Sequence, residues 1–216
     1  MTMRILGLIF VLICFSCSSS DDNNSNNNNN NNNNTPRTTI PDAAFEQALI
    51  DLGFDNALDG SVATSSIENV TDLVMNNKGI TSLQGLEDFS SLLNLWVNDN
   101  SLTSINVAQN GSLKFLYAER NMLTQINVTN LANLEKLGLN GNQLTAINVA
   151  NNFNLQQLVV PDNQIENIDV SNNTALTVLN VVNNPLTCIR VNAEQFTNTP
   201  AQWQKDAEDQ YALTCN

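Results

Sequence analysis

The four cysteines, Cys14, Cys17, Cys188 and Cys215, are the side chains of this 216-residue chain best suited to covalent chemistry. A cysteine thiolate can act as a nucleophile, ligate zinc or form a disulfide. The chain has no histidine, which removes the commonest general base and the commonest metal ligand. The cysteines lie in two groups near the two ends of the chain, without a zinc-site pattern. We therefore expect no catalytic thiol, no metal and no cofactor.

Charge and motif content exclude further classes of protein. The net charge is −13, and the eight lysines and arginines form no basic cluster that could bind phosphates. The sequence also lacks a glycine-rich phosphate loop and the GxSxG, HExxH and EF-hand patterns. We therefore expect a protein that binds no nucleic acid and is not an enzyme.

The first 17 residues have the form of an export signal. Arg4 is the only charged residue before Asp21, and residues 5–15 are apolar, which is shorter than the roughly 20 residues of a membrane span. The following Ser16-Cys17 resembles a bacterial lipoprotein box, although Cys14 occupies a position that is usually aliphatic. The resemblance implies a lipoprotein signal over residues 1–17, with a lipid on Cys17 as the only membrane anchor. An ordinary signal peptide cut nearby is the alternative.

Residues 18–38 are expected to form a tether. The acidic residues just after Cys17 resemble signals that direct some Gram-negative lipoproteins to the cell surface. The asparagine run that follows, residues 23–34, is interrupted only by Ser25 and contains no apolar side chain to bury. Such a segment is typical of disorder. We expect an exported outer-membrane lipoprotein that is exposed on the cell surface.

A repeat with a period of 21 residues dominates the rest of the chain. Its copies share the pattern LxxLxLxxNxLTxIxV, and alternate residues of the LxL segment point inward if that segment is a strand. One copy cannot bury its apolar residues alone, so neighbouring copies must stack around a continuous core. The copies begin at Leu92, Leu113, Leu134, Leu155 and Leu176, with a sixth at Val70, 22 residues before the first.

This pattern resembles the leucine-rich repeat family in its short, internalin-like bacterial form. The resemblance implies a mostly β protein of the α/β class, a right-handed solenoid with six parallel strands over residues 70–191. It also implies that the asparagine of each repeat is buried and hydrogen-bonds turn backbone. Lys78 replaces this asparagine in the first repeat, so we expect an irregular coil there. The asparagine column contains Asn100, Asn121, Asn142, Asn163 and Asn184.

A solenoid needs caps over its two open ends, and residues 39–69 are expected to form the first. The spacing of apolar residues predicts a helix over residues 40–53 with Asp42 as its N-cap and Gly53 just past its end. Its buried face would contain Phe45, Leu49 and Leu52.

Residues 192–216 are expected to form the second cap. Cys188 lies in the last repeat, and a bond to Cys215 would close a loop of about 28 residues and stabilise the fold by about 3.5 kcal/mol. Export favours this disulfide over the alternative of two free thiols. The aromatic residues available to cover the last coil are Phe196, Trp203 and Tyr211.

Outward-pointing strand positions form columns across the sheet, where this family commonly binds partners. Trp96 and Tyr117 are adjacent in the central column, followed by Gly138, which would leave a gap beside Tyr117, and by Val159. Phe115 points to the same side as Tyr117. Exposed aromatic residues with a polar rim are typical of interaction patches, whereas cross-strand stabilisation of the sheet is the alternative. The rim contains Glu119, Arg120 and Lys136.

These features predict a non-catalytic surface protein, and we expect it to be a monomer. It would bind a protein or glycan partner through its concave sheet face, in recognition or adhesion. A structural spacer without a specific ligand is the alternative, because a fold does not determine a function.

Overall fold

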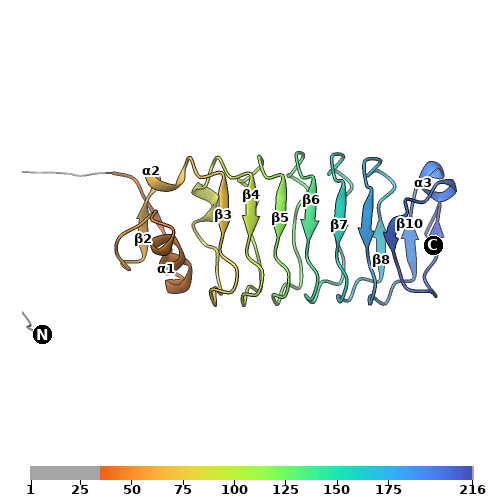
Figure 1. Ribbon diagram of the computed structural model, residues 1–216, viewed down its shortest axis with the longest axis horizontal. Helices are drawn as coiled ribbons and strands as arrows, with labels where there is room; N and C mark the ends of the chain where they lie inside the picture. The colour runs from red at the N-terminus through yellow and green to blue at the C-terminus, as the bar shows by residue number, and fades with distance from the viewer. Residues whose placement is uncertain (1–34, 216) are drawn as a thin grey trace, which may run out of the picture. The chain divides into compact units, whose positions relative to one another are not determined.

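A computed structural model describes residues 35–215, and in it the repeats form a solenoid, as the sequence predicted (Figure 1). Each turn of the chain contributes one short strand to a seven-stranded sheet in which neighbouring strands are parallel. The strands, in spatial order, are β3 (Asp72–Val74), β4 (Asn94–Trp96), β5 (Phe115–Tyr117), β6 (Lys136–Gly138), β7 (Gln157–Val159), β9 (Val178–Asn180) and β11 (Gln202–Gln204).

The core follows directly from the repeat. The central residue of each strand is buried while its two neighbours face outward, as the alternation of a strand requires. Leu95 pairs with Leu116, and Leu116 with Leu137, so that one leucine lies beside the next from coil to coil. All three have no exposed surface. The continuous apolar column makes each coil dependent on its neighbours.

The sheet has one strand more than the six that the sequence predicted. β11 pairs with β9 in parallel, although its sequence, QWQ, lies beyond the last recognisable repeat. Trp203 takes the place of the central leucine, pairs with Leu179 and is 8% exposed. A short alternating segment with one large apolar residue is sufficient to continue the sheet after the repeat pattern has ended.

The asparagine column joins each coil to the preceding one. In all five asparagines the Nδ2 group donates to at least one carbonyl of its own coil and to one of the preceding coil, with these bonds at 2.8–3.2 Å. The Oδ1 atom accepts from a backbone N–H of the preceding coil at 3.0–3.1 Å. An amide suits this position because it is both donor and acceptor.

The first coil is irregular beside Lys78, as the sequence predicted, because Gly79 has φ of 73° whereas Ser101, its equivalent in the next coil, has no positive φ. Asn77, just before Lys78, has φ of 52°, in the left-handed region also adopted at the equivalent Asp99. Asn100 of the next coil accepts from the backbone N–H of both Lys78 and Ile80 at 3.0 and 3.1 Å. Each column asparagine hydrogen-bonds the backbone of the preceding coil, so Asn100 serves the first coil, which needs no asparagine of its own.

A second set of buried asparagines escaped the sequence analysis. Asn110, Asn152 and Asn173 are at most 1% exposed, and each donates from Nδ2 to two carbonyls of the preceding coil. Gln195 continues the set by donating to Val170 and Asn173. The Oδ1 atoms of the three asparagines have no hydrogen-bond partner among the described residues.

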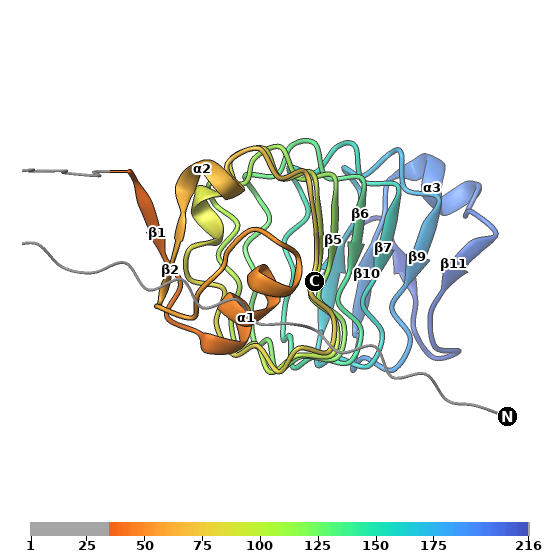
Figure 2. The ribbon, with the colours of Figure 1, turned by 60° about the vertical axis from the view of Figure 1, so that its left-hand side comes forward.

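The N-terminal cap contains α1 (Ala43–Asp51), shorter at both ends than the predicted helix (Figure 2). The Asp42 side chain accepts from the N–H groups of Ala44 and Phe45 at 2.9 Å, as an N-cap does. Phe45 stacks on Phe89 of the first coils, with ring centroids 6.3 Å apart. Leu52 is 44% exposed because the helix ends before it, so its predicted place in the buried face was wrong.

A two-stranded hairpin completes this cap. The antiparallel strands β1 (Arg37–Thr39) and β2 (Ser61–Ala63) pair, and α2 (Thr64–Ile67) follows. The predicted boundary between tether and cap, after residue 38, therefore falls inside a strand. Glu46 of α1 is buried and accepts from the N–H groups of residues 59–61 at 2.6–3.0 Å, which holds the loop against the helix.

The C-terminal cap is closed by the predicted disulfide between Cys188 and Cys215, whose Cα atoms are 5.9 Å apart. Opposite the main sheet, β8 (Asn167–Asp169), β10 (Cys188–Arg190) and β12 (Tyr211–Ala212) form a second parallel sheet, and α3 (Ala193–Thr197) lies nearby. Trp203 and Tyr211 pack together with centroids 5.7 Å apart. Phe196 is 49% exposed, so it does not cover the last coil.

The predicted signal, the lipid site at Cys17 and most of the tether lie outside the described residues. Between residues 35 and 215, no helix has the length and apolar character needed to cross a bilayer. The remaining element is the 3-10 helix η1 (Leu86–Asp88), between β3 and β4.

Candidate functional site

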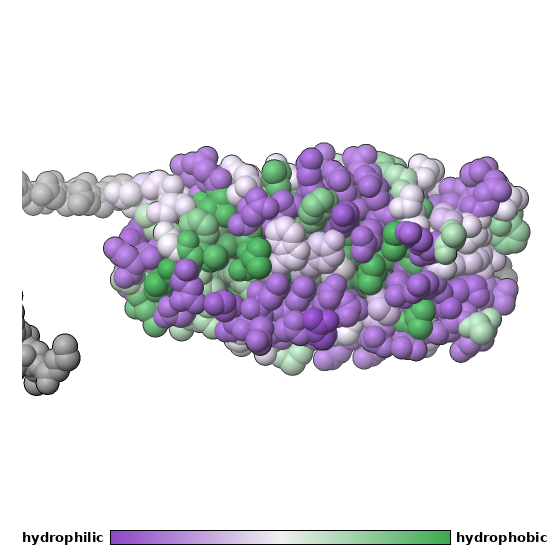
Figure 3. Space-filling model, in the orientation of Figure 1, coloured by the Kyte–Doolittle hydropathy of each residue, from purple (hydrophilic) through white to green (hydrophobic). Residues whose placement is uncertain are grey.

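Three aromatic side chains predicted for the sheet face lie together on adjacent strands. We call Trp96, Phe115 and Tyr117 the aromatic cluster. Trp96 and Tyr117 are register partners on β4 and β5, and their rings are stacked, with centroids 6.2 Å apart and planes 10° from parallel. All three are half-buried. Figure 3 shows weakly polar side chains gathered at mid-height over β4 to β6, with hydrophilic ones above and below.

Gly138 lies against one edge of the Tyr117 ring, which corrects the expectation of an open gap. A Cβ atom on Gly138 would lie 2.6 Å from Cδ1 of Tyr117 and 3.0 Å from Oε1 of Glu119. Gly138 is buried although its position faces out of the sheet. Only a residue without a side chain allows the ring to lie here, so Gly138 determines where Tyr117 rests.

One edge of the cluster is lined by charged groups that neutralise one another. Arg120 forms a two-pronged ion pair with Asp99, with a distance of 2.7 Å between Nη2 and Oδ2, and also approaches Glu119 at 3.4 Å. The hydrogen bonds from Arg120 lower the pKa of Asp99. Asn140 faces Glu119 and, with its amide nitrogen turned to that side, donates to both carboxylate oxygens at 3.0 and 3.1 Å.

The opposite edge carries Lys136, Asp72 and Asn94. The Lys136 ammonium lies 4.8 Å from the centre of the Phe115 ring, in a cation–π contact. Asn94 donates to Asp72 at 2.7 Å. The Thr71 hydroxyl and the Asn94 amide both hydrogen-bond Asp72 and lower its pKa. This edge therefore also presents fixed polar groups beside an aromatic face.

Burial raises the pKa of Tyr117, and the nearby negative charge of Glu119 raises it further. The Tyr117 hydroxyl therefore stays protonated at neutral pH and remains able to donate a hydrogen bond. The arrangement offers flat apolar surface edged by donors and acceptors, without a nucleophile activated by a neighbouring base.

The structure brings together all but one of the predicted binding residues. Val159 lies beyond Gly138 in the same column, as its register partner on β7, and is half-buried. Sequence analysis missed Asp99, the partner of Arg120. The signal was present, because the two residues are 21 apart and so occupy the same place in consecutive repeats.

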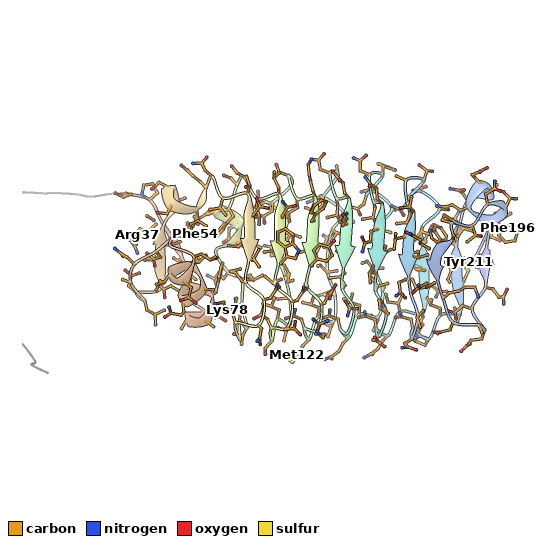
Figure 4. All side chains as sticks on the ribbon, in the orientation of Figure 1. Arg37, Phe54, Lys78, Met122, Phe196 and Tyr211 are labelled. Atoms are coloured by element: carbon orange, nitrogen blue, oxygen red, sulfur yellow. A yellow bond between two sulfur atoms is a disulfide. The ribbon has the colours of Figure 1, made fainter. Side chains whose placement is uncertain are left out.

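Val74, which is 49% exposed, is the register partner of Trp96 and extends the apolar surface, whereas other exposed apolar side chains lie apart from the cluster. Met122 lies at the rim of the coils and Phe196 at the C-terminal end (Figure 4). A hollow of about 600 Å³ is lined by residues of β8 and β10, including Ile168 and Asp169, and so lies beside the second sheet. The aromatic cluster is therefore a flat surface feature of the main sheet.

Comparisons with known proteins agree with this architecture. No family model and no curated protein matches the chain. The structure of the functional domain of InlJ from Listeria monocytogenes, which includes a cysteine ladder, is 26% identical with a TM-score of 0.66. The match covers 76% of this chain and 41% of that one, so the chain spans less than half of that structure's length.

A second structure, internalin C2 from Listeria monocytogenes, is 21% identical with a TM-score of 0.51. That match covers 81% of this chain and 90% of the other, and at this identity it supports the fold alone. The 21-residue repeat, the solenoid built from it and the likeness to InlJ lead to one conclusion. The chain folds as a leucine-rich repeat solenoid similar to that of InlJ.

Proposed function

We propose that this protein is a non-catalytic recognition module that binds a partner through the exposed face of its main sheet. The observation that carries the proposal is the aromatic cluster, an apolar surface placed between two polar edges. Its resemblance to internalin-like proteins supports a role in recognition in general. The site on the sheet face is our inference from the side chains themselves.

The repeat does not require aromatic rings at these positions, which favours a role in binding. The column that holds Trp96 and Tyr117 is occupied by Val74 in the first coil and by Asn180 in the sixth. Valine and asparagine therefore meet the structural demands of the same column. Tryptophan and tyrosine are among the residues most often found at the energetic centre of interfaces.

The charged groups near the cluster support a binding role without catalysis. Asp99 and Glu119 are engaged by Arg120, and Glu119 also faces Asn140. A general acid or base needs a pKa near the working pH and a free path to a substrate proton. Paired carboxylates with lowered pKa values, such as Asp99, are poorly suited to that task.

Site-specific photo-crosslinking tests the proposal. A photoreactive phenylalanine analogue at Val159 should form adducts with a macromolecule from the protein's native surroundings, because this position lies next to Gly138, on the side toward which the Tyr117 ring inclines. The same analogue at Phe153, which is 60% exposed in the turn before β7, is the matched control and should form none. Equal adducts at both positions, or none at Val159, would contradict binding at the sheet face and favour a structural spacer.

We also propose that the protein is anchored at the cell surface by a lipid on Cys17. The lipobox-like Ser16-Cys17 and the asparagine-rich tether support this, and the disulfide favours an extracellular location. Labelled fatty acid should be incorporated by the natural chain and by Cys14→Ser, but not by Cys17→Ser. Incorporation into Cys17→Ser would refute the assignment.

A further inference from the structure

The Trp96 and Tyr117 rings lean in the same direction. Their planes differ by 10°, and the edge of the Tyr117 ring lies where the Gly138 side chain would otherwise project. Tyr117 therefore inclines over the neighbouring strand, and Trp96 follows the same tilt. The pair offers two consecutive, nearly parallel ring faces on adjacent strands.

The charges around the pair are nearly balanced, and each charged group is held by a neighbouring side chain. Three carboxylates, Asp72, Asp99 and Glu119, face two cations, Arg120 and Lys136, which leaves a local net charge of −1. Arg120 is bound by Asp99, and Lys136 lies over the Phe115 ring. A polyanion requires free cations and a strongly basic partner requires excess negative charge. The balance favours an uncharged ligand.

The polar groups on both edges suit hydroxyl groups. Glu119 and Asp72 are acceptors, whereas Asn140 and Arg120 are donors, and the Tyr117 hydroxyl is both. A sugar ring carries C–H groups on its face and hydroxyls around its edge. Its face can cover an aromatic ring while its edge hydrogen-bonds planar amides and carboxylates.

We propose that the ligand of this surface is a neutral glycan whose consecutive sugar rings stack on Trp96 and Tyr117. This rests on the proposed function, because it assigns a ligand class to the same sheet face. A protein partner is less well matched, because protein hot spots fill well-packed pockets and this pair lies on a flat sheet face. The hollow of about 600 Å³ beside β8 lies elsewhere.

The two tryptophans make the test direct. Trp96 is partly exposed, whereas Trp203 is only 8% exposed, so a ligand that covers the pair should change the emission of Trp96 alone. The full-length protein is titrated with three soluble neutral polymers, laminarin, mannan and galactan, and with anionic heparin. We expect at least one neutral polymer to shift the emission saturably and to protect it from acrylamide quenching, and heparin to do neither.

Variants identify the surface. Trp96→Phe should lose the fluorescence response, and Tyr117→Ala should weaken binding of the polymer at least roughly tenfold in native affinity gels. Gly138→Ala should also weaken it, because its Cβ displaces the Tyr117 ring. Phe153→Ala removes an exposed aromatic outside the sheet and should bind as the natural protein does. Circular dichroism confirms that each variant is folded.

The outcomes separate this inference from the proposed function. If none of the three neutral polymers binds, or if heparin binds more tightly than all of them, the glycan inference is overturned. Adducts from position 159 that contain protein and disappear with Tyr117→Ala would then preserve recognition through the sheet face. If no neutral polymer binds and position 159 forms no such adducts, both the glycan inference and the proposed function are overturned.

Discussion

Replacing Asn142 by alanine should destabilise the solenoid strongly, although Asn142 lies far from both caps in the sequence. Its Oδ1 accepts from the N–H of Leu123 at 3.0 Å, and its Nδ2 donates to Ala118 at 3.0 Å and Leu139 at 2.9 Å. The two carbonyls keep other donors, Asn121 and Asn163. The Leu123 N–H, however, would remain buried without an acceptor.

The magnitude follows from these bonds. An orphaned buried donor costs about 1–3 kcal/mol, and each lost hydrogen bond about 0.5–1.5 kcal/mol. The free energy of unfolding should therefore fall by about 4 kcal/mol, a large part of the 5–15 kcal/mol typical of a domain. For a folded unit of this size, this corresponds to a decrease in melting temperature of roughly 12 °C.

Asn152→Leu is the matched control, since Asn152 is also a buried asparagine that bonds to the preceding coil. It donates to Val128 and Leu131 at 2.9 and 2.8 Å, and both carbonyls also accept from backbone N–H groups. Its Oδ1 has no partner among the described residues, and Leu131 occupies the same place one coil earlier. The leucine variant should lose only about 1 kcal/mol.

Urea titrations followed by circular dichroism measure both variants. The ratio of the two losses is the decisive quantity, because it depends on which backbone groups are left without partners. If Asn142→Ala and Asn152→Leu lower the free energy of unfolding equally, our account of the asparagine column is refuted.

Three further predictions concern the caps and the sheet face. Replacing Cys188 and Cys215 by serine should lower the free energy of unfolding by about 3.5 kcal/mol and make urea midpoints insensitive to reductant. Gly138→Ala should cost about 1–3 kcal/mol, and much less in combination with Tyr117→Ala, in a double-mutant cycle. Burial alone would raise the pKa of Asp42, but the hydrogen bonds that its carboxylate accepts lower this pKa below 3.8. The stabilising contribution of the Asp42 carboxylate is therefore fully present above pH 3.8 and is lost as the pH falls through the lowered pKa. Asp42→Asn should remove that part of the acid dependence of thermal melts.

The repeated part of the fold was predictable because every coil repeats the same contacts. Leu116 and Asn121 occupy positions that recur every 21 residues, so five copies report the same environment. The recurring leucine marks the position that points into the core, and the recurring asparagine marks the position that hydrogen-bonds the preceding coil. Spacing therefore predicted the strands and the buried core, and the family resemblance predicted that the strands are parallel.

Features that occur once were harder to predict. Phe196 and Trp203 are both aromatic residues beyond the last repeat, but only Trp203 lies in an alternating segment that can pair with β9. Lys78 appeared to break the column, yet the bonds run from each coil to the preceding one, so the first coil needs no asparagine. The second asparagine set has the same 21-residue spacing but is interrupted by Leu131.

The candidate site shows the same division between repeated and unique features. Repeat register correctly placed Trp96 and Tyr117 side by side, because both follow the buried leucine of their strands. The direction of the rings depends on Gly138, which sequence analysis interpreted as a gap and which the Tyr117 ring in fact covers. The column holds valine in one coil, a ring in each of the next two and glycine beyond them, so the repeat itself does not dictate its side chains. Such a column can change its side chains to suit a ligand while the leucine and asparagine columns maintain the fold.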